Sequence, residues 1–358
     1  MAARKYKGEK KKLTENEALD RSNFDGKVVL ITGCTNGIGL GAFEEILSMQ
    51  TYIPRKLILL NRNKERSDDL SEQVRNKGME VSTYIADLSK PKEVLNIIAS
   101  ILESEPVIDI ALLNAGAWTC ISEKDRFVQE DGYEYHYAVN YLQCVMLAEG
   151  LATRMSESAA ASKGESRIVV QGSFTSFDLS KGVLNFEILK GKDGIHNAPG
   201  APAGFANSFT YSQSKLAQHT WVKAKGCDQE GGIAPGVTIN IVCPGAVTTN
   251  AEVVRLMKSK LGCLFKCIAK GLMGQRHPSV GCTTLLCAGG SKVFKGLNGT
   301  HLSFGLGGKP VFYAPCDGEW FPQSKWALCP TIADKAQRTR LVNETNAEIE
   351  KMKTKYLK

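Results

Sequence analysis

The sequence predicts an α/β fold, in which helices cover both faces of a single Rossmann-type, doubly wound parallel sheet. Short apolar runs, each followed by a stretch with helical patterning, indicate this class. They lie at 28–33, 56–61, 81–85, 109–114, 167–172 and 237–243. The runs are continuously apolar, which is typical of strands buried on both faces. Ligands of such sheets bind beyond the carboxyl ends of the strands, so we expect the functional residues to follow the strands.

The bulk composition is that of a globular chain with one large core. The chain has 358 residues, of which 43% are hydrophobic and 23% are charged. A net charge of +8 is mild for this length. It suits an anionic small ligand, and no basic stripe with interleaved aromatic residues indicates nucleic acid. The 11 cysteines are scattered without zinc-type spacing, so we expect reduced thiols and no metal.

The predicted organisation is one domain between two basic tails. The tails are residues 1–25 and 346–358, and the domain spans 26–345. Within the domain, 174–210 reads as an insertion and 250–280 as a substrate lid. No apolar run is long enough to span a membrane, and no secretory signal is evident, so we expect a cytoplasmic location. The lysines of the lid leave peripheral contact with an anionic membrane as an alternative.

A glycine-rich turn, "TGCTNGIG", follows the first predicted strand. It begins at Thr32 and places Gly33, Gly37 and Gly39 where a strand gives way to a helix. Backbone N–H groups and a helix N-terminus then meet at one place, which favours a pyrophosphate. The spacing differs from the G-x-G-x-x-G fingerprint. An ordinary tight turn therefore remains the alternative.

The end of the second strand indicates which dinucleotide binds. Asn61 and Arg62 stand there, with no carboxylate to take the ribose hydroxyls of NAD. A guanidinium can hold a 2′-phosphate through two hydrogen bonds. The sequence therefore predicts NADP, with an uninvolved surface arginine as the alternative.

A candidate acid–base pair follows the fifth strand. Tyr211 and Lys215 are four residues apart, which places both on one face of a helix. We expect the ammonium to lower the pKa of the phenol from about 10 toward neutrality. Such a phenol can exchange a proton with a carbonyl oxygen. Ser173, at the end of that strand, could hold the same oxygen.

These motifs, in this order, resemble those of the short-chain dehydrogenase/reductase family. The resemblance covers roughly residues 26–250 and continues more faintly to about 345. Further matches are Asp87 in "ADLS", the Asn114–Ala115–Gly116 segment, Asn140 in "YAVNYL" and Pro244–Gly245 in "CPGAVTTN". Within the family, the chain is similar to the NADP-using retinol dehydrogenase-like group through "GVLNFEIL", "GGKPVF" and "QRTRLVNETNAEIEKM". It departs from that group in the longer interval between Ser173 and Tyr211.

The resemblance implies a catalytic tetrad of Ser173, Tyr211, Lys215 and Asn140. Hydride would pass between C4 of the nicotinamide and a carbonyl carbon, and Tyr211 would exchange the proton. Ser173 would orient the oxygen, Lys215 would hold the ribose, and Asn140 would support a water relay. Taken with the turn and the second strand, it predicts these cofactor contacts: Thr32, Gly33, Thr35, Asn36, Gly37, Ile38, Gly39, Asn61, Arg62, Asp87, Leu88, Asn114, Ala115, Gly116, Tyr211, Lys215, Pro244, Gly245, Val247 and Thr248.

The apolar lid predicts a hydrophobic carbonyl or alcohol substrate, such as a retinoid, a steroid or another lipid. The expected activity is that of an NADP-dependent oxidoreductase. A non-catalytic NADP-binding regulator that senses redox state is the main alternative, and a sugar-nucleotide epimerase or dehydratase is a further one. The oligomeric state is left open by the sequence.

Overall fold

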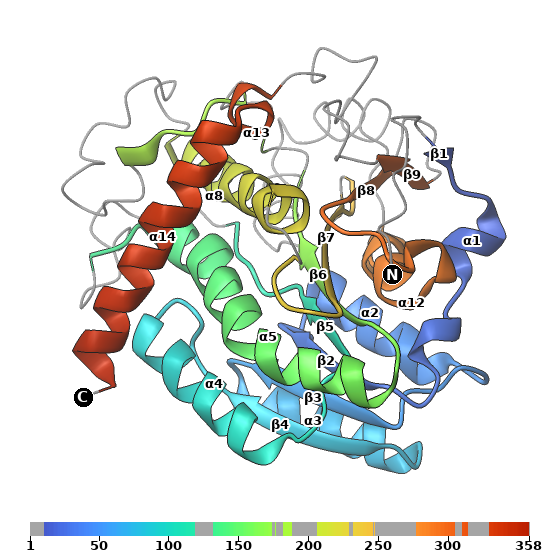
Figure 1. Ribbon diagram of the computed structural model, residues 1–358. Coiled ribbons are helices and arrows are strands. Elements are labelled where there is room, and N and C mark those ends of the chain that lie inside the picture. Colours follow the sequence, from blue (N-terminus) through green and yellow to red (C-terminus); the bar gives the residue numbers. More distant parts are fainter. Residues whose placement is uncertain are drawn as a thin grey trace, which may run out of the picture.

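The computed structural model describes residues 11–118, 132–173, 182–187, 206–228, 232–245, 277–304, 310–313 and 329–357, together with 176 and 247. Within these residues, nine strands form one sheet (Figure 1). Its parallel part has the order β4-β3-β2-β5-β6-β7-β8. These strands are β2 (Val28–Thr32), β3 (Lys56–Asn61), β4 (Glu80–Ile85), β5 (Ile110–Leu113), β6 (Ser166–Gln171), β7 (Val237–Cys243) and β8 (His301–Phe304). The predicted doubly wound fold is confirmed.

Two antiparallel strands extend the sheet beyond β8. These are β9 (Pro310–Tyr313), which pairs with β8, and β1 (Lys11–Lys12), which pairs with β9. The six predicted strands agree with the structure, whereas β1, β8 and β9 were not predicted. Each of these three has at most four residues. Such short runs carry too few residues to show a period.

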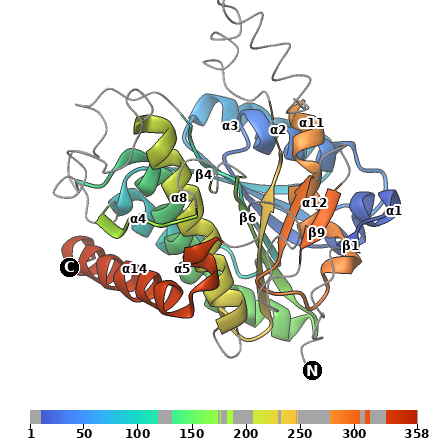
Figure 2. The same cartoon turned by 90° about the horizontal axis from the view of Figure 1, so that it is seen from above.

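Helices form one layer on each face of the sheet (Figure 2). One layer holds α2 (Gly37–Ser48), α3 (Lys64–Asn76) and α12 (Thr283–Gly290), and the other holds α4 (Pro91–Ser104), α5 (Gln143–Ala161) and α8 (Ala206–Lys223). Side chains alternate across the sheet: Val28 and Leu30 belong to the core under α4, and Val29 and Ile31 to the core under α2. Other short helices in the described part of the chain are α1 (Glu15–Leu19), η1 (Ser22–Phe24), η3 (Tyr137–Leu142), η5 (Ala224–Asp228), α11 (Pro278–Gly281), η6 (Lys292–Phe294) and α13 (Pro330–Ala333). No described helix is both long and apolar enough to cross a bilayer.

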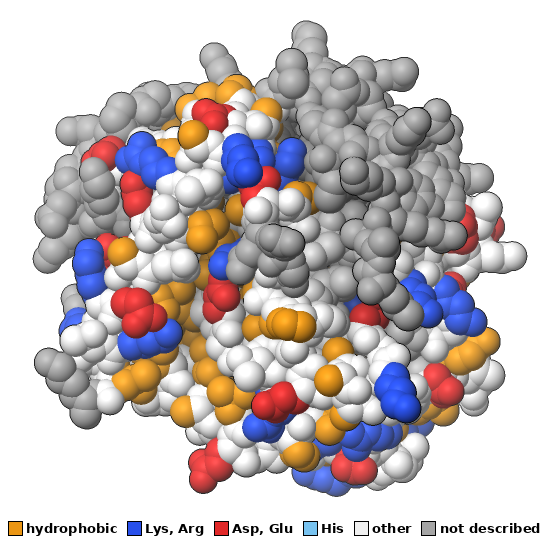
Figure 3. Space-filling view, viewed as in Figure 1, with side chains coloured by type: hydrophobic (Ala, Val, Ile, Leu, Met, Phe, Trp, Pro, Cys, Tyr) orange, Lys and Arg blue, Asp and Glu red, His pale blue; other side chains and the backbone are white. Residues whose placement is uncertain are grey.

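The predicted C-terminal tail is wrong for residues 346–356, because they belong to the long helix α14 (Lys335–Tyr356). Ile349 and Met352 from this helix are buried in the core on the α5 side. Ion pairs such as Arg340–Glu344 and Lys353–Glu350 cover its outer side. Figure 3 shows Lys, Arg, Asp and Glu side chains beside a band of apolar side chains on this face of the molecule. A basic sequence can therefore be a packed amphipathic helix.

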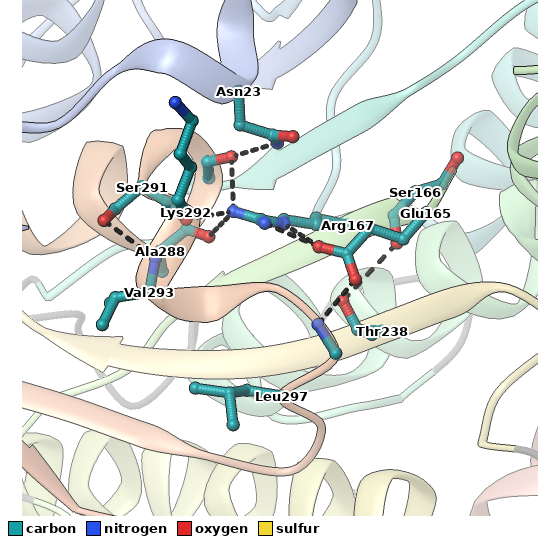
Figure 4. Close-up of polar contacts among 12 residues, drawn as sticks. Asn23, Glu165, Ser166, Arg167, Thr238, Ala288, Ser291, Lys292, Val293 and Leu297 are labelled. Atoms are coloured by element: carbon teal, nitrogen blue, oxygen red, sulfur yellow. Dashed lines mark hydrogen bonds and ion pairs between the residues drawn. The ribbon is translucent and has the colours of Figure 1, made fainter. Parts of the chain in front are cut away.

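The buried Arg167 holds the end of α12 to the sheet (Figure 4). Its Nη1 donates to the carbonyls of Gly289 and Ser291 at 3.2 and 2.8 Å. The Glu165 carboxylate lies 2.6 Å from its Nη2 and also accepts the N–H of Gly296 at 2.7 Å. A cation at a helix C-terminus satisfies the unpaired carbonyls and favours the helix dipole. This contact lies at the start of β6, at the opposite end of that strand from Ser173.

The predicted N-terminal tail is also wrong from Lys11 onward. Leu13, Ala18 and Phe24 are buried in the core on the α12 side. The Phe24 ring packs on the glycines at the end of α12, where a Cβ on Gly290 would lie 2.5 Å from the ring. Apolar residues are too sparse in 1–25 to show a period, but the burial of these three side chains fixes residues 13–24 against the core.

We predict that Phe24→Ala lowers the free energy of unfolding by about 3–5 kcal/mol, because it leaves a cavity against α12. Urea denaturation of the full chain measures the change. Leu19→Ala is the matched control, since Leu19 lies on the same segment and is 52% exposed. Equal, small losses in the two variants would show that residues 13–24 are only loosely attached.

Candidate active site

The glycine turn connects β2 to α2 with the expected geometry. Gly33 and Gly37 have φ values of +68° and +60°, a region that favours glycine. A Cβ on Gly39 would lie only 2.2 Å from the Gly33 carbonyl oxygen, so this position also requires glycine. The Asn36 side chain accepts the Gly37 N–H at 2.8 Å and caps the start of α2. Thr35 and Ile38 lie partly exposed on the same turn.

The segment after β5 fixes this turn from the side. Asn114 Nδ2 donates to the carbonyls of Thr32 and Gly33 at 3.1 and 3.0 Å. The Ala115 N–H donates to Thr32 Oγ1 at 2.9 Å. A Cβ on Gly116 would lie 2.9 Å from Asn140 Oδ1 and 3.5 Å from Lys215 Nζ. The structure thus brings the Asn-Ala-Gly segment, the glycine turn and two predicted catalytic residues together.

The four predicted catalytic residues meet at the carboxyl end of β6. Ser173 follows this strand, and its side chain hydrogen-bonds to that of Tyr211 on α8. Lys215 is 3% exposed, donates to the Gln171 carbonyl at 2.7 Å, and has its Nζ 5.9 Å from the centre of the Tyr211 ring. The phenol and the ammonium therefore lie one turn apart on α8, next to the hydroxyl at the end of β6.

The Asn140 side chain links the segment after β5 to α8. It lies in the π-helical segment η3, a distortion frequent at functional sites. Its Oδ1 accepts the Ala117 N–H at 2.7 Å, and its Nδ2 donates to the Ala117 carbonyl and to Ser214 Oγ, each at 3.0 Å. The Asn140 carbonyl accepts Gln218 Nε2 at 2.7 Å.

Comparison with known proteins agrees with this arrangement. The family model of the short chain dehydrogenases matches residues 27–186. Retinol dehydrogenase 14 from Mus musculus is 29% identical over 263 residues, which cover 70% of each chain. Over these residues the chain is similar to the short-chain dehydrogenase/reductase family.

Solved structures of other proteins share the fold. A 3-oxoacyl (acyl-carrier-protein) reductase from Agrobacterium tumefaciens, with NADP bound, has a TM-score of 0.56 at 18% identity, covering 78% of this chain and 93% of its own. L-sorbose reductase from Gluconobacter frateurii, complexed with NADPH and L-sorbose, has a TM-score of 0.57 at 18% identity, covering 79% and 96%. At these identities the likeness concerns the fold alone.

Asn61, predicted as a cofactor contact, is instead buried behind the glycine turn and bonds to it. It is 1% exposed, and its Oδ1 accepts the Cys34 N–H at 2.8 Å. Its Nδ2 lies 3.3 Å from Cys34 Sγ. Arg62, the next residue, is exposed at the same strand end. Of the two, Arg62 is therefore the one whose side chain reaches solvent.

The other predicted cofactor residues lie at the same edge of the sheet or outside the described part. Asp87 follows β4, and its Oδ1 accepts the N–H and the hydroxyl of Ser89 at 3.0 and 2.8 Å. Leu88 and Pro244 are buried, Gly245 has a φ of +72°, and Val247 faces Gly281 of α11. Thr248 and nearly all of the predicted lid at 250–280 lie outside the described residues.

Part of the predicted insertion at 174–210 is described, and it lies beside the site. Gln213, two residues after Tyr211, accepts the Asn185 N–H at 2.7 Å and donates to the Val183 carbonyl at 2.9 Å. The Leu184 N–H donates to Thr331 Oγ1 at 2.9 Å. Residues 182–187 are thus held between α8 and α13, and Ala206–Thr210 already belong to α8.

The expected direction of the Tyr211 pKa is wrong for this structure. Burial raises the pKa of Tyr211 to about 12, although its hydrogen bond with Ser173 acts in the opposite direction. Burial also lowers the pKa of Lys215 to about 8. The sequence shows the charge of Lys215 but not the loss of water around both groups, and here desolvation is the larger effect.

Sequence reasoning missed two aromatic neighbours of Tyr211. Trp118 is 46% exposed, and its ring centroid lies 6.1 Å from that of Tyr211. His136 is fully buried, and its ring meets the Tyr211 ring edge-on at 5.9 Å. Trp118 follows the Asn-Ala-Gly segment by two residues, which is a usable signal. His136 stands four residues before Asn140, but only its contact partners show its importance.

A buried histidine pair lies beneath Lys215. His219 Nδ1 donates to the Lys215 carbonyl at 2.9 Å, because a carbonyl can only accept. The His219 and His301 rings are 5.0 Å apart, edge to face. Burial lowers the pKa of His219 to about 4 and lowers the pKa of His301 as well. Both rings are therefore neutral in the folded protein near neutral pH.

We predict that the free energy of unfolding falls as the pH decreases from 6.5, the ordinary pKa, to about 4. In this window the unfolded chain binds a proton at His219 that the folded chain does not. This difference lowers the free energy of unfolding by about 3 kcal/mol across the window. Urea denaturation at both ends of the window measures the slope, and His219→Gln should reduce it. Thr220→Val, a substitution on α8 that removes no titratable group, is the control and should keep the native slope. A His219→Gln slope equal to that of the native chain would contradict this account.

Proposed function

We propose that this protein uses NADP(H) to interconvert an apolar ketone or aldehyde and its alcohol. The observation that carries the proposal is the meeting of Ser173, Tyr211 and Lys215 beside the glycine turn. Two hydroxyls that hydrogen-bond to each other can also share one carbonyl oxygen between them. The similarity to the short-chain dehydrogenases supports an oxidoreductase, and the residues present match the chemistry of carbonyl reduction.

The glycine turn fits the pyrophosphate of a dinucleotide. Its backbone N–H groups and the start of α2 favour an anion, and Gly39 has no space for a side chain. Lys215 uses one of its three N–H groups on the Gln171 carbonyl, so two can serve ribose hydroxyls. Arg62 is the candidate partner for a 2′-phosphate. When bound, the cofactor supplies or accepts the hydride.

Tyr211 is the proposed proton donor in reduction. With a pKa raised to about 12, its phenol is fully protonated at neutral pH and ready to donate. Ser173 Oγ orients the substrate oxygen against the phenol. Lys215, with a pKa of about 8, still carries its charge at neutral pH and favours the phenolate left after proton transfer. The main-chain carbonyl of Asn140 is the proposed end of a water relay that returns the proton.

An exposed tryptophan supports an apolar substrate. Trp118 presents a large aromatic surface to solvent next to the Tyr211 ring. Burying that surface against an apolar molecule is favourable. Some relatives are named retinol dehydrogenases, and retinol is an apolar alcohol of this kind. We therefore propose a retinoid, a steroid or another lipid carbonyl as the substrate. The cytoplasmic location and the contact of the lid with a membrane stay predictions.

We predict that Tyr211→Phe lowers kcat at least about a hundred-fold, because the proton donor is lost. NADPH affinity, measured by the fluorescence of the bound cofactor, should stay within a few-fold. A panel of apolar ketones and aldehydes provides the activity assay. Tyr52→Phe is the matched control, since Tyr52 is an exposed tyrosine before β3.

Full turnover by Tyr211→Phe would contradict the proposed mechanism. Tight NADPH binding by a native chain that reduces none of the panel would instead favour the redox-sensing regulator. No measurable NADPH binding would contradict both functions.

We predict that Arg62→Gln weakens NADPH binding about ten- to a hundred-fold and leaves NADH binding unchanged. The reason is that a hydrogen bond to a charged phosphate contributes about 1.5–3 kcal/mol. Titration with both cofactors measures the ratio. Arg66→Gln, at an exposed position on α3, is the control. Equal losses for NADPH and NADH would contradict 2′-phosphate recognition by Arg62.

A further inference from the structure

A buried hydrogen-bonded chain joins the two segments that carry the predicted catalytic residues. Glu134, His136 and Thr210 are each 0% exposed. His136 Nδ1 lies 3.1 Å from Glu134 Oε1 and 3.0 Å from Thr210 Oγ1. Thr210 directly precedes Tyr211, and His136 lies four residues before Asn140. One imidazole therefore connects the helix of the proton donor to the segment of Asn140.

The same imidazole also touches the proton donor itself. Its ring lies edge-on to the Tyr211 ring, with centroids 5.9 Å apart and an interplanar angle of 79°. Edge-to-face packing is one of the preferred geometries of aromatic pairs. Trp118 lies against Tyr211 at a centroid distance of 6.1 Å. Rotation of the Tyr211 ring would break the His136 packing.

Glu134 fixes the orientation of the His136 imidazole. Its second carboxyl oxygen accepts the Tyr137 N–H at 2.8 Å, so the carboxylate is bound to the first turn of the helix that continues into η3. Its first oxygen faces His136 Nδ1, whose N–H can serve this oxygen and Thr210 Oγ1 together. A buried carboxylate that is bound at both oxygens is held in a single position. The imidazole is therefore oriented by the protein backbone through Glu134.

We propose that His136 is a positioning residue for Tyr211: anchored by Glu134, it holds Thr210 and the Tyr211 ring so that the phenol faces the Ser173 hydroxyl. The inference rests on the proposed function of Tyr211 as proton donor. Displacement of a reacting group by about 1 Å can cost about a hundred-fold in rate. His136 touches no reacting atom, and its effect passes through the placement of Tyr211.

Four variants separate this role from simple core packing. Thr210→Val keeps the shape of the side chain and removes its hydroxyl, whereas Thr210→Ser retains the hydroxyl. His136→Leu removes both contacts, whereas His136→Asn retains a nitrogen donor close to the place of Nδ1. Thr220→Val is the matched control on α8, where a buried threonine hydroxyl donates to the Leu216 carbonyl at 2.9 Å.

We predict that kcat falls about a hundred-fold in His136→Leu and about ten-fold in Thr210→Val, with the KM for NADPH within two-fold of the native value. Thr210→Ser and His136→Asn should recover most of the loss, and Thr220→Val should keep the native kcat. Equal kcat in all folded variants, or losses in Thr220→Val as large as those in Thr210→Val, would overturn the proposal.

A second readout does not depend on turnover. Fluorotyrosine placed at position 211 gives a fluorine NMR signal that reports how many orientations the ring adopts. We expect one narrow resonance in the native chain and a broad or divided one in His136→Leu and Thr210→Val, restored in Thr210→Ser. A narrow resonance in every variant, or a broad one already in the native chain, would overturn the proposal. Absence of NADPH binding or of carbonyl reduction would contradict the proposed function and leave this spectral comparison intact.

Discussion

A buried ammonium at the end of β6 is the interaction on which the arrangement of the site depends. Lys215 is removed from water, so its N–H groups need partners within the protein, and the Gln171 carbonyl supplies one at 2.7 Å. This bond fixes α8 against the carboxyl edge of the sheet. Tyr211, one helical turn earlier, is then placed beside the end of β6, where Ser173 meets it.

The glycine turn and the catalytic residues are one connected structure. Asn114 holds the turn, the next residues reach Asn140, and the Asn140 side chain contacts Ser214 on α8. The Asn114 bonds join the ends of two neighbouring strands, and the Asn140 bonds join η3 to the segment after β5 and to α8. Because so many polar groups satisfy one another here, the loss of one partner leaves another buried and unpaired, which costs more than a surface hydrogen bond.

Burial acts on the acid–base residues in opposite directions. It favours the neutral form of both, so it raises the pKa of Tyr211 and lowers that of Lys215. A neutral phenol beside a cation is a suitable proton donor for carbonyl reduction. The adjacent buried histidines respond to the same desolvation, which keeps extra positive charge away from Lys215 near neutral pH.

By itself, the sequence determined the fold class, the six parallel strands β2 to β7 and the glycine turn, and it singled out Ser173, Tyr211 and Lys215, which lie together in the structure. These features depend on local periodicity and on residue types at short spacing, which a linear chain displays. Only the tertiary structure decided that Asn61 turns inward, that residues 13–24 and 346–356 pack on the core, and that His136 meets Tyr211. The reason is that a side chain becomes buried, and gains its partners, only when residues far apart in sequence pack together. The desolvation that shifts a pKa arises from this packing.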